Sequence, residues 1–163
     1  MGNKKGMNRS RRTSTGLFLL AAVMLGAADL RIETAFTRYY TGEAIRPIGQ
    51  YFREAGPRQG FRTVVASEPE NPEGQYFIAR LEGKTAPGVV TRAQMTLYAT
   101  DSKEPQEVEW DLEGIEARRW LYLGITGSDW PGEAVQPLAW HIRLTDATGR
   151  MLAEWKSFLW EQP

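Results

Sequence analysis

The chain has 163 residues, with 20 basic and 20 acidic residues, so its formal net charge is zero. This length is enough for one domain with a hydrophobic core of its own. Because the chain contains no cysteine, disulfides, cysteine nucleophiles and thiolate metal sites are excluded.

Residues 1–28 have the layout of a secretory signal peptide. The segment contains five basic residues and no acid, and an apolar run over 17–25 follows the last basic residue, Arg12. Gly26 and Ala28 are the small residues expected before a cut after Ala28. The run is shorter than the roughly 20 residues that a membrane-spanning helix needs. We therefore expect export to the periplasm or the extracellular space. An uncleaved membrane anchor at residues 16–28 is the alternative, and the absence of cysteine excludes a lipoprotein.

Removal of this leader leaves an acidic chain. The whole chain has 20 basic residues and the leader has five, so 15 basic residues remain beside 20 acidic ones, a net charge of −5. Proteins that bind nucleic acid usually carry a basic surface. We therefore expect no nucleic-acid partner, and membrane contact only through the N-terminal segment if it is not cleaved.

The rest of the chain alternates apolar and polar residues with the period of two that is typical of strands. The first predicted strand covers residues 30–40, and a short one is predicted inside the turn-rich segment that follows, at 50–53. Loops are predicted at 68–74 and 127–137, where prolines interrupt the pattern. The other predicted strands before the last hairpin are 61–66, 75–81, 89–98, 107–113 and 120–125.

Two of these strands have informative patterns. In residues 107–113, Val108, Trp110 and Leu112 alternate with acidic residues, which predicts a strand with one face in water. In residues 120–125, apolar side chains occupy both parities, which predicts a central strand covered on both faces.

Residues 140–160 predict a β-hairpin around the turn Asp146-Ala147-Thr148-Gly149. Asp can bond its own backbone, and Gly tolerates a positive φ. A four-residue loop places Thr145 opposite Arg150, Leu144 opposite Met151, and Ile142 opposite Ala153. One face is then entirely apolar and carries Trp140, Ile142, Leu144, Met151, Ala153 and Trp155. The other face is mostly polar and carries His141, Arg143, Thr145, Arg150, Leu152, Glu154 and Lys156.

Seven to eight strands in regular succession, without a convincing helix, predict an all-β fold for residues 29–163. The specific expectation is an antiparallel two-sheet sandwich of the immunoglobulin-like or fibronectin-like class. A jelly roll or a small β-barrel is the alternative.

The sequence contains no recognisable catalytic constellation. His141 is the only histidine and is predicted to pair with Glu154 across the hairpin. A Ser-His-Asp triad would need His141, and no serine lies in the Gly-x-Ser-x-Gly motif. The candidate nucleophiles would be Ser67, Ser102, Ser128 and Ser157. There is no GxGxxG sequence and no phosphate loop, so we expect no cofactor.

The densest group of loop carboxylates is Glu68, Glu70 and Glu73. Such a loop can hold calcium without a recognisable motif. A solvated acidic loop is the favoured interpretation, so we expect no metal site.

The charges are unevenly distributed. Residues 31–62 carry six arginines and three acids, and residues 101–116 carry seven acids and only Lys103 as a base. We expect the two segments to pair within the domain. The alternative is that one of them meets a partner, in an association that depends on salt.

Aromatic residues at predicted outer positions are the candidate interaction surface, because Trp and Tyr are favoured at recognition surfaces. Coverage by a neighbouring strand or loop is the alternative for these side chains. The candidate residues are Tyr39, Tyr40, Arg118, Arg119, Trp130, Phe158 and Trp160.

The sequence therefore predicts an exported, non-enzymatic β-sandwich that binds a protein or glycan partner in the cell envelope or outside it. Three other hypotheses remain. One is a carbohydrate-binding module that stacks sugars on Trp130, Trp160 or the tyrosines. Another is a subunit of an envelope assembly that pairs through an edge strand. The last is a hydrolase with His141 or two carboxylates in a concave pocket.

Overall fold

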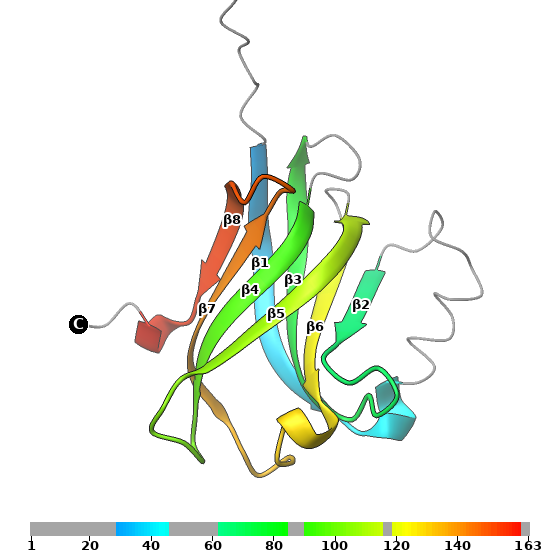
Figure 1. The fold of residues 1–163 in the computed structure, drawn as a ribbon, viewed down its shortest axis with the longest axis vertical. Helices are drawn as coiled ribbons and strands as arrows, with labels where there is room; N and C mark the ends of the chain where they lie inside the picture. The colour runs from blue at the N-terminus through cyan, green and yellow to red at the C-terminus, as the bar shows by residue number, and fades with distance from the viewer. Residues whose placement is uncertain (1–28, 46–61, 85–89, 116–118, 161–163) are drawn as a thin grey trace, which may run out of the picture.

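The computed structural model describes residues 29–45, 62–84, 90–115 and 119–160. It is a β-sandwich, in which two four-stranded sheets pack together (Figure 1). The export leader and the short strand at 50–53, both predicted from the sequence, lie outside the described residues.

The first sheet, sheet A, has the strand order β1-β3-β6-β2. Its strands are β1 (Asp29–Tyr40), β2 (Arg62–Ala66), β3 (Gly74–Lys84) and β6 (Trp120–Thr126). β3 runs antiparallel to both β1 and β6, but β2 runs parallel to β6. The expectation of a purely antiparallel sandwich is therefore wrong for this sheet.

The β2–β3 connection explains the parallel pair. It passes around the end of β6, so β2 and β3 lie on opposite sides of that strand and run in opposite directions. Two backbone hydrogen bonds hold it there: Ser67 N–H donates to Gly124 O at 2.9 Å, and Gly127 N–H donates to Glu73 O at 2.9 Å. Gly127 has a φ of 62°, which L side chains rarely adopt, and a Cβ atom there would collide with the Glu68 carboxylate.

The second sheet, sheet B, has the order β5-β4-β7-β8 and is antiparallel throughout. Its strands are β4 (Val90–Ala99), β5 (Gln106–Ile115), β7 (Pro137–Thr145) and β8 (Met151–Lys156). Two short 3-10 helices complete the fold, η1 (Gly127–Asp129) after β6 and η2 (Phe158–Trp160) after β8. A helical turn at 42–45 also follows β1.

The hydrophobic core lies between the sheets, because side chains alternate between the two faces of a strand. Sheet A contributes Phe77, Leu81, Leu121, Leu123 and Ile125. Sheet B contributes Ala93, Met95, Leu97, Trp110, Leu112, Ile142 and Leu144. Val108 packs against this core with Trp110 and Leu112, so the predicted inner face of β5 is confirmed.

A second, smaller cluster covers the outer face of sheet A. It consists of Ile45 from the helical turn and of Tyr76, Ile78 and Tyr122 from β3 and β6. Both strands are therefore buried on both faces, which confirms the prediction that residues 120–125 form a central strand. Burial raises the pKa values of the Tyr76 and Tyr122 hydroxyls, so both stay neutral at physiological pH.

The β7–β8 hairpin turns at the predicted residues. The Asp146 carboxylate accepts hydrogen bonds from the backbone N–H groups of Thr148 and Arg150, at 2.9 and 3.1 Å. Gly149 has a φ of 81°, a left-handed conformation that favours glycine. The predicted turn chemistry is therefore confirmed.

The predicted register of the hairpin is wrong by two residues. Ile142 lies opposite Trp155, and Leu144 lies opposite Ala153. A shift of two positions keeps each side chain on its face. These four side chains therefore still belong to the core or pack against it.

A β-bulge next to the turn exchanges two further predicted positions. Thr145 lies opposite Met151 while Leu144 lies opposite Ala153, which leaves Leu152 as an extra residue in β8. An extra residue reverses the inward and outward positions on its turn side. Leu152 therefore packs against the core and Met151 is 53% exposed, the reverse of the prediction.

The indole of Trp110 joins the two sheets and gives a stability prediction. Its Nε1 donates to the Gly124 carbonyl of sheet A at 3.1 Å. We expect Trp110→Phe to lower the free energy of unfolding by about 1 kcal/mol, because the Gly124 carbonyl loses one of its two donors and keeps only the Ser67 N–H. Trp130→Phe is the matched control: Trp130 is equally buried, and its Nε1 has no partner in the described part of the chain. Urea unfolding followed by circular dichroism measures both, and equal losses would contradict the role of the hydrogen bond.

The Asp146 turn predicts a pH dependence. The hydrogen bond from the Thr148 hydroxyl, with those from two backbone N–H groups, lowers the pKa of Asp146. A lowered folded pKa stabilises the protein above the unfolded value of about 4, and this contribution is lost as the pH falls through the folded value. We therefore expect Asp146→Ala to destabilise the chain at pH 7, and the difference from wild type to shrink below about pH 4. Urea unfolding midpoints of the wild type and Asp146→Ala, measured across pH 2–7, test this prediction. A difference between the two midpoints that stays constant with pH would contradict it.

Candidate interaction site

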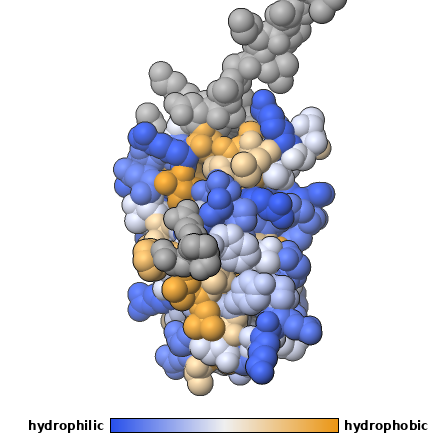
Figure 2. Space-filling view, turned by 90° about the vertical axis from the view of Figure 1, so that its left-hand side faces the viewer, coloured by the Kyte–Doolittle hydropathy of each residue, from blue (hydrophilic) through white to orange (hydrophobic). Residues whose placement is uncertain are grey.

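The surface around η2 carries the most exposed large apolar side chains among the described residues. Phe158 is 75% exposed and Leu159 is 55% exposed. We call this surface the η2 patch and define it as Tyr98, His141, Phe158, Leu159 and Trp160. Figure 2 faces the β8 and η2 side of the molecule and shows hydrophobic side chains there, interrupted by hydrophilic ones.

Ser157 places η2 on the sheet. It is only 5% exposed, and its N–H donates to the Trp140 carbonyl at 2.9 Å. Its hydroxyl accepts the Trp140 N–H at 3.0 Å, and its own carbonyl accepts the Trp160 N–H at 3.1 Å. The chain therefore leaves β8 at Ser157 and folds back, which brings Trp160 over the outer face of sheet B.

Trp160 forms the inner part of the patch. Its ring centroid lies 5.5 Å from that of His141 on β7 and 6.0 Å from that of Tyr98 on β4. The rings are tilted at 46° and 44° to the indole, so the contacts are neither parallel stacks nor edge-on. Trp160 is half-buried by them, while Phe158 and Leu159 face outward.

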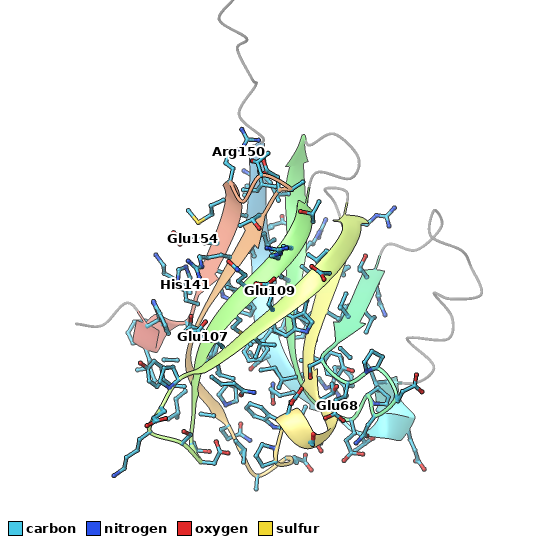
Figure 3. All side chains as sticks on the ribbon, viewed as in Figure 1. Glu68, Glu107, Glu109, His141, Arg150 and Glu154 are labelled. Carbon is cyan, nitrogen blue, oxygen red and sulfur yellow. The ribbon has the colours of Figure 1, made fainter. Side chains whose placement is uncertain are left out.

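His141 also joins the patch to the charged side chains of the outer face. Its Nε2 lies 2.8 Å from Glu154 Oε2, and Lys156 Nζ lies 3.2 Å from Glu154 Oε1. The hydrogen bonds to His141 and then Lys156 lower the pKa of the Glu154 carboxyl. Figure 3 shows His141 and Glu154 next to each other on neighbouring strands. The predicted pairing is thus confirmed, although the two residues are diagonal neighbours, since Arg143 lies directly opposite Glu154.

Two of the seven predicted interaction residues, Phe158 and Trp160, come together in this patch. Tyr39 and Tyr40 are half-buried at the end of β1. The Tyr39 hydroxyl donates to Glu73 at 2.8 Å, and burial together with this bond raises the pKa of Tyr39 to about 12. Tyr40 packs edge-on against Tyr76 at 5.6 Å, so both tyrosines have structural contacts.

The other predicted residues fall elsewhere. Trp130 is only 4% exposed and packs in the core, so its predicted place on the surface is wrong. Trp130 follows η1 directly, and its N–H donates to the Gly127 carbonyl at 3.4 Å. Arg119 is half-buried, and its carbonyl accepts the Leu81 N–H at 2.9 Å. Arg118 lies outside the described residues.

Two members of the η2 patch, Leu159 and Tyr98, and the residue that positions it, Ser157, were not predicted from the sequence. Leu159 was given no role, although it follows Phe158 directly. Tyr98 was treated as the last residue of a strand, and its contact with Trp160 joins segments 62 residues apart in sequence. Ser157 was considered only as a catalytic serine. A small polar residue at the end of a strand, before three bulky apolar ones, was the available signal for a change of direction.

The glutamates of the 68–74 loop act as structural acceptors. Glu68 accepts the Ser128 N–H at 3.1 Å and also its hydroxyl. Glu73 accepts the Tyr39 hydroxyl and, at 3.2 Å, the Gly42 N–H. Protein donors thus contact two of the three loop glutamates, so the interpretation of a merely solvated loop is incomplete. Across the described ranges, no three His, Cys, Asp or Glu residues are placed to hold a metal ion.

The basic and acidic segments do not pair with each other among the described residues. Arg31 of β1 binds Glu82 on the adjacent strand β3, at 3.5 Å. Glu109 of β5 binds Arg92 on the adjacent strand β4, at 3.1 Å. β1 and β5 belong to different sheets, so each finds its partners within its own sheet. The expected pairing of the two segments is therefore wrong for the part of the chain described.

Comparison with known proteins identifies no relative: no family model, curated protein or solved structure matches the chain. Within the described ranges, no helix is both long enough and apolar enough to span a membrane.

The attachment of η2 gives a prediction for Ser157→Ala. The substitution leaves the Trp140 N–H without its acceptor, so we expect the free energy of unfolding to fall by about 1 kcal/mol. We also expect faster amide hydrogen exchange at 158–160, because Ser157 fixes the direction of η2. Ser102→Ala, in the β4–β5 turn, is a control that should leave this exchange unchanged. Unchanged exchange at 158–160 in Ser157→Ala would contradict the assigned role.

Proposed function

We propose that this chain is an exported, non-enzymatic β-sandwich that binds a protein partner through the η2 patch. The observation that carries the proposal is the exposure of Phe158 and Leu159, at 75% and 55%, on a turn held by hydrogen bonds between Ser157 and Trp140. Exposed apolar side chains that are held in place mark contact surfaces, because water around them is released on binding. A fixed turn also loses little conformational entropy when a partner binds.

The composition of the patch favours a protein partner over a glycan. Sugar binding uses flat, accessible aromatic rings. Within the η2 patch Phe158 is the most exposed ring, at 75%, whereas Tyr98 is 37% exposed and Trp160 is half-buried against His141 and Tyr98. Leu159 adds an aliphatic surface that suits an apolar protein side chain. Of the other predicted stacking residues, Trp130 is buried, and Tyr39 and Tyr40 are half-buried. A carbohydrate-binding module is therefore the second candidate, supported mainly by the exposed ring of Phe158.

The position of the patch also suits a subunit of an envelope assembly. It follows β8 directly, and β8 is an edge strand of sheet B. An edge strand offers unpaired backbone groups to a strand of another chain. A partner that covers Phe158 and Leu159 would thus lie beside this edge.

Export and the absence of catalysis belong to the same proposal. The leader at residues 1–28 supports export, to the periplasm or the extracellular space. The only histidine, His141, binds Glu154 and contacts Trp160, which supports a structural role for it.

We also propose that the sandwich is immunoglobulin-like or fibronectin-like. The order β1-β3-β6 opposite β5-β4-β7-β8 corresponds to strands A-B-E opposite C′-C-F-G of that fold. β2 takes the place of strand D beside E, but it precedes strand B in the chain and runs parallel to E. It would then be an addition within the A–B connection.

Site-specific photo-crosslinking in the native envelope tests the binding function. A photoreactive amino acid at Phe158 should give one discrete protein adduct, and the same group at Phe36 is the control. Phe36 is also an exposed aromatic, at 43%, but lies on β1 in the other sheet. Leu159→Ser should reduce the adduct about tenfold, as expected when an interface loses a central apolar contact of ~1.4 kcal/mol.

The other outcomes are equally informative. Equal adducts from both positions, or none from Phe158, would contradict binding through the η2 patch. Binding to a glycan array that Phe158→Ala abolishes would favour the carbohydrate-binding module.

A further inference from the structure

One free edge of sheet B lies along β8 and leads directly into the η2 patch. β7 pairs with one side of β8, and no strand of the described ranges pairs with its other side. Figure 1 shows β8 as the outermost strand of its sheet, with η2 below it. An unpaired strand edge presents backbone donors and acceptors to a strand of another chain. The residues of β8 therefore decide which strand fits there.

The hydrogen bond at the end of β8 shows which of its backbone groups point outward. Ser157 N–H donates to the Trp140 carbonyl of β7 at 2.9 Å. In an antiparallel strand, successive residues direct their N–H and C=O groups alternately to one neighbour and to the other. The backbone groups of Trp155 therefore face β7, whereas those of Glu154 and Lys156 point to the free edge. An added strand would form its hydrogen bonds with these two residues.

The charges at these two positions are complementary to a second copy of β8. When two copies pair antiparallel with Trp155 opposite Trp155, each Glu154 lies opposite the Lys156 of the other copy. Pairing Glu154 with Glu154, or Lys156 with Lys156, would oppose like charges, which destabilises a sheet. Within one chain, Lys156 Nζ lies 3.2 Å from Glu154 Oε1. Each carboxylate would exchange this lysine for that of the other copy and keep its contact with His141, so no charge loses its partner.

Exposed apolar side chains lie at both ends of β8. Met151 begins the strand and is 53% exposed, and the exposed Phe158 and Leu159 follow its end. Met151 precedes Trp155 by four residues, and Leu159 follows it by four. In the antiparallel arrangement, the start of each strand lies beside the end of the other, so Met151 of one copy comes level with η2 of the other. Their contact would remove apolar surface from water at two places.

We propose that the partner of the η2 patch is a second copy of this chain, in a two-fold symmetric dimer whose β8 strands pair antiparallel about Trp155. This inference rests on the proposed binding function and names its partner. A two-fold interface uses the same surface of both chains, so every favourable contact occurs twice. The opposite edge of sheet B does not suit this role, because β5 carries Glu107, Glu109 and Asp111 and would repel a second copy of itself.

Sedimentation equilibrium of the purified chain, over concentrations of about 1–300 μM, tests the proposal. We expect a reversible monomer–dimer equilibrium that high salt weakens, because the charged side chains are partly exposed. Glu154→Lys and Lys156→Glu should each weaken the dimer at least about tenfold, since each substitution opposes like charges at two places. A mixture of the two variants should associate at least about tenfold more tightly than either variant alone, because every pair across the interface again joins unlike charges.

Two matched controls reverse the same charges elsewhere in the chain. Glu109→Lys on β5 and Lys103→Glu in the β4–β5 turn should leave the dimer within about twofold, because neither residue belongs to the β8 edge. A photoreactive amino acid at Phe158 of the purified chain supplies an independent readout. It should join η2 to the Met151 end of β8 in a second copy, which mass spectrometry of the cross-linked peptides would identify.

Two results would overturn the proposal. A chain that stays monomeric over the whole concentration range does not form the dimer. A photo-adduct with a different envelope protein would in that case leave the proposed binding function in place, so the two failures are distinguishable. A dimer that both reversed variants retain, or a mixture that associates no more tightly than either variant, would place the contact away from the β8 edge.

Discussion

Burial of the two inner sheet faces against each other is the interaction on which the rest of the structure depends. Neither sheet is stable alone, because each would leave a row of large apolar side chains in water. Trp110 shows how closely the sheets are joined: its ring lies in the core and its N–H donates to the opposite sheet at 3.1 Å. The acidic residues that alternate with Val108, Trp110 and Leu112 along β5 therefore face outward.

The η2 patch is a consequence of this packing. Trp140 and Trp155 point inward and pack edge-on against each other and Phe77, which fixes the end of the hairpin. The backbone of Trp140 is thereby in place to bind Ser157, and Ser157 directs η2 back over the sheet. The exposed phenylalanine and leucine are thus carried by a rigid support, which suits a binding surface better than a free C-terminal segment would. The η2 patch presents apolar side chains outward, so release of water would drive association there.

Sequence reasoning succeeded where one strand, by its own alternation, decides which side is buried. It identified the strands, the inner face of β5, the Asp146 turn, the His141–Glu154 pair and the exposure of Phe158. Its predictions were wrong where contacts with a segment distant in sequence determine the pairing or burial of a residue. The register of the hairpin shifted by two residues because alternation is equally satisfied after such a shift, and the bulge at Leu152 changed the parity near the turn. Phe158 and Trp160 were assigned one face of an extended strand, but the strand ends at Lys156.

What the sequence determined by itself was therefore the local pattern: a chain of strands with apolar inner faces, polar outer faces and turns where Asp, Gly and Pro require them. Only the tertiary structure decided that β2 runs parallel to β6, that Trp130 turns inward, and that Tyr98, His141 and Trp160 meet. The physical reason is that alternation acts between neighbours in the chain, whereas pairing, burial and ring contacts depend on segments that are brought together only when the two sheets close on their common core.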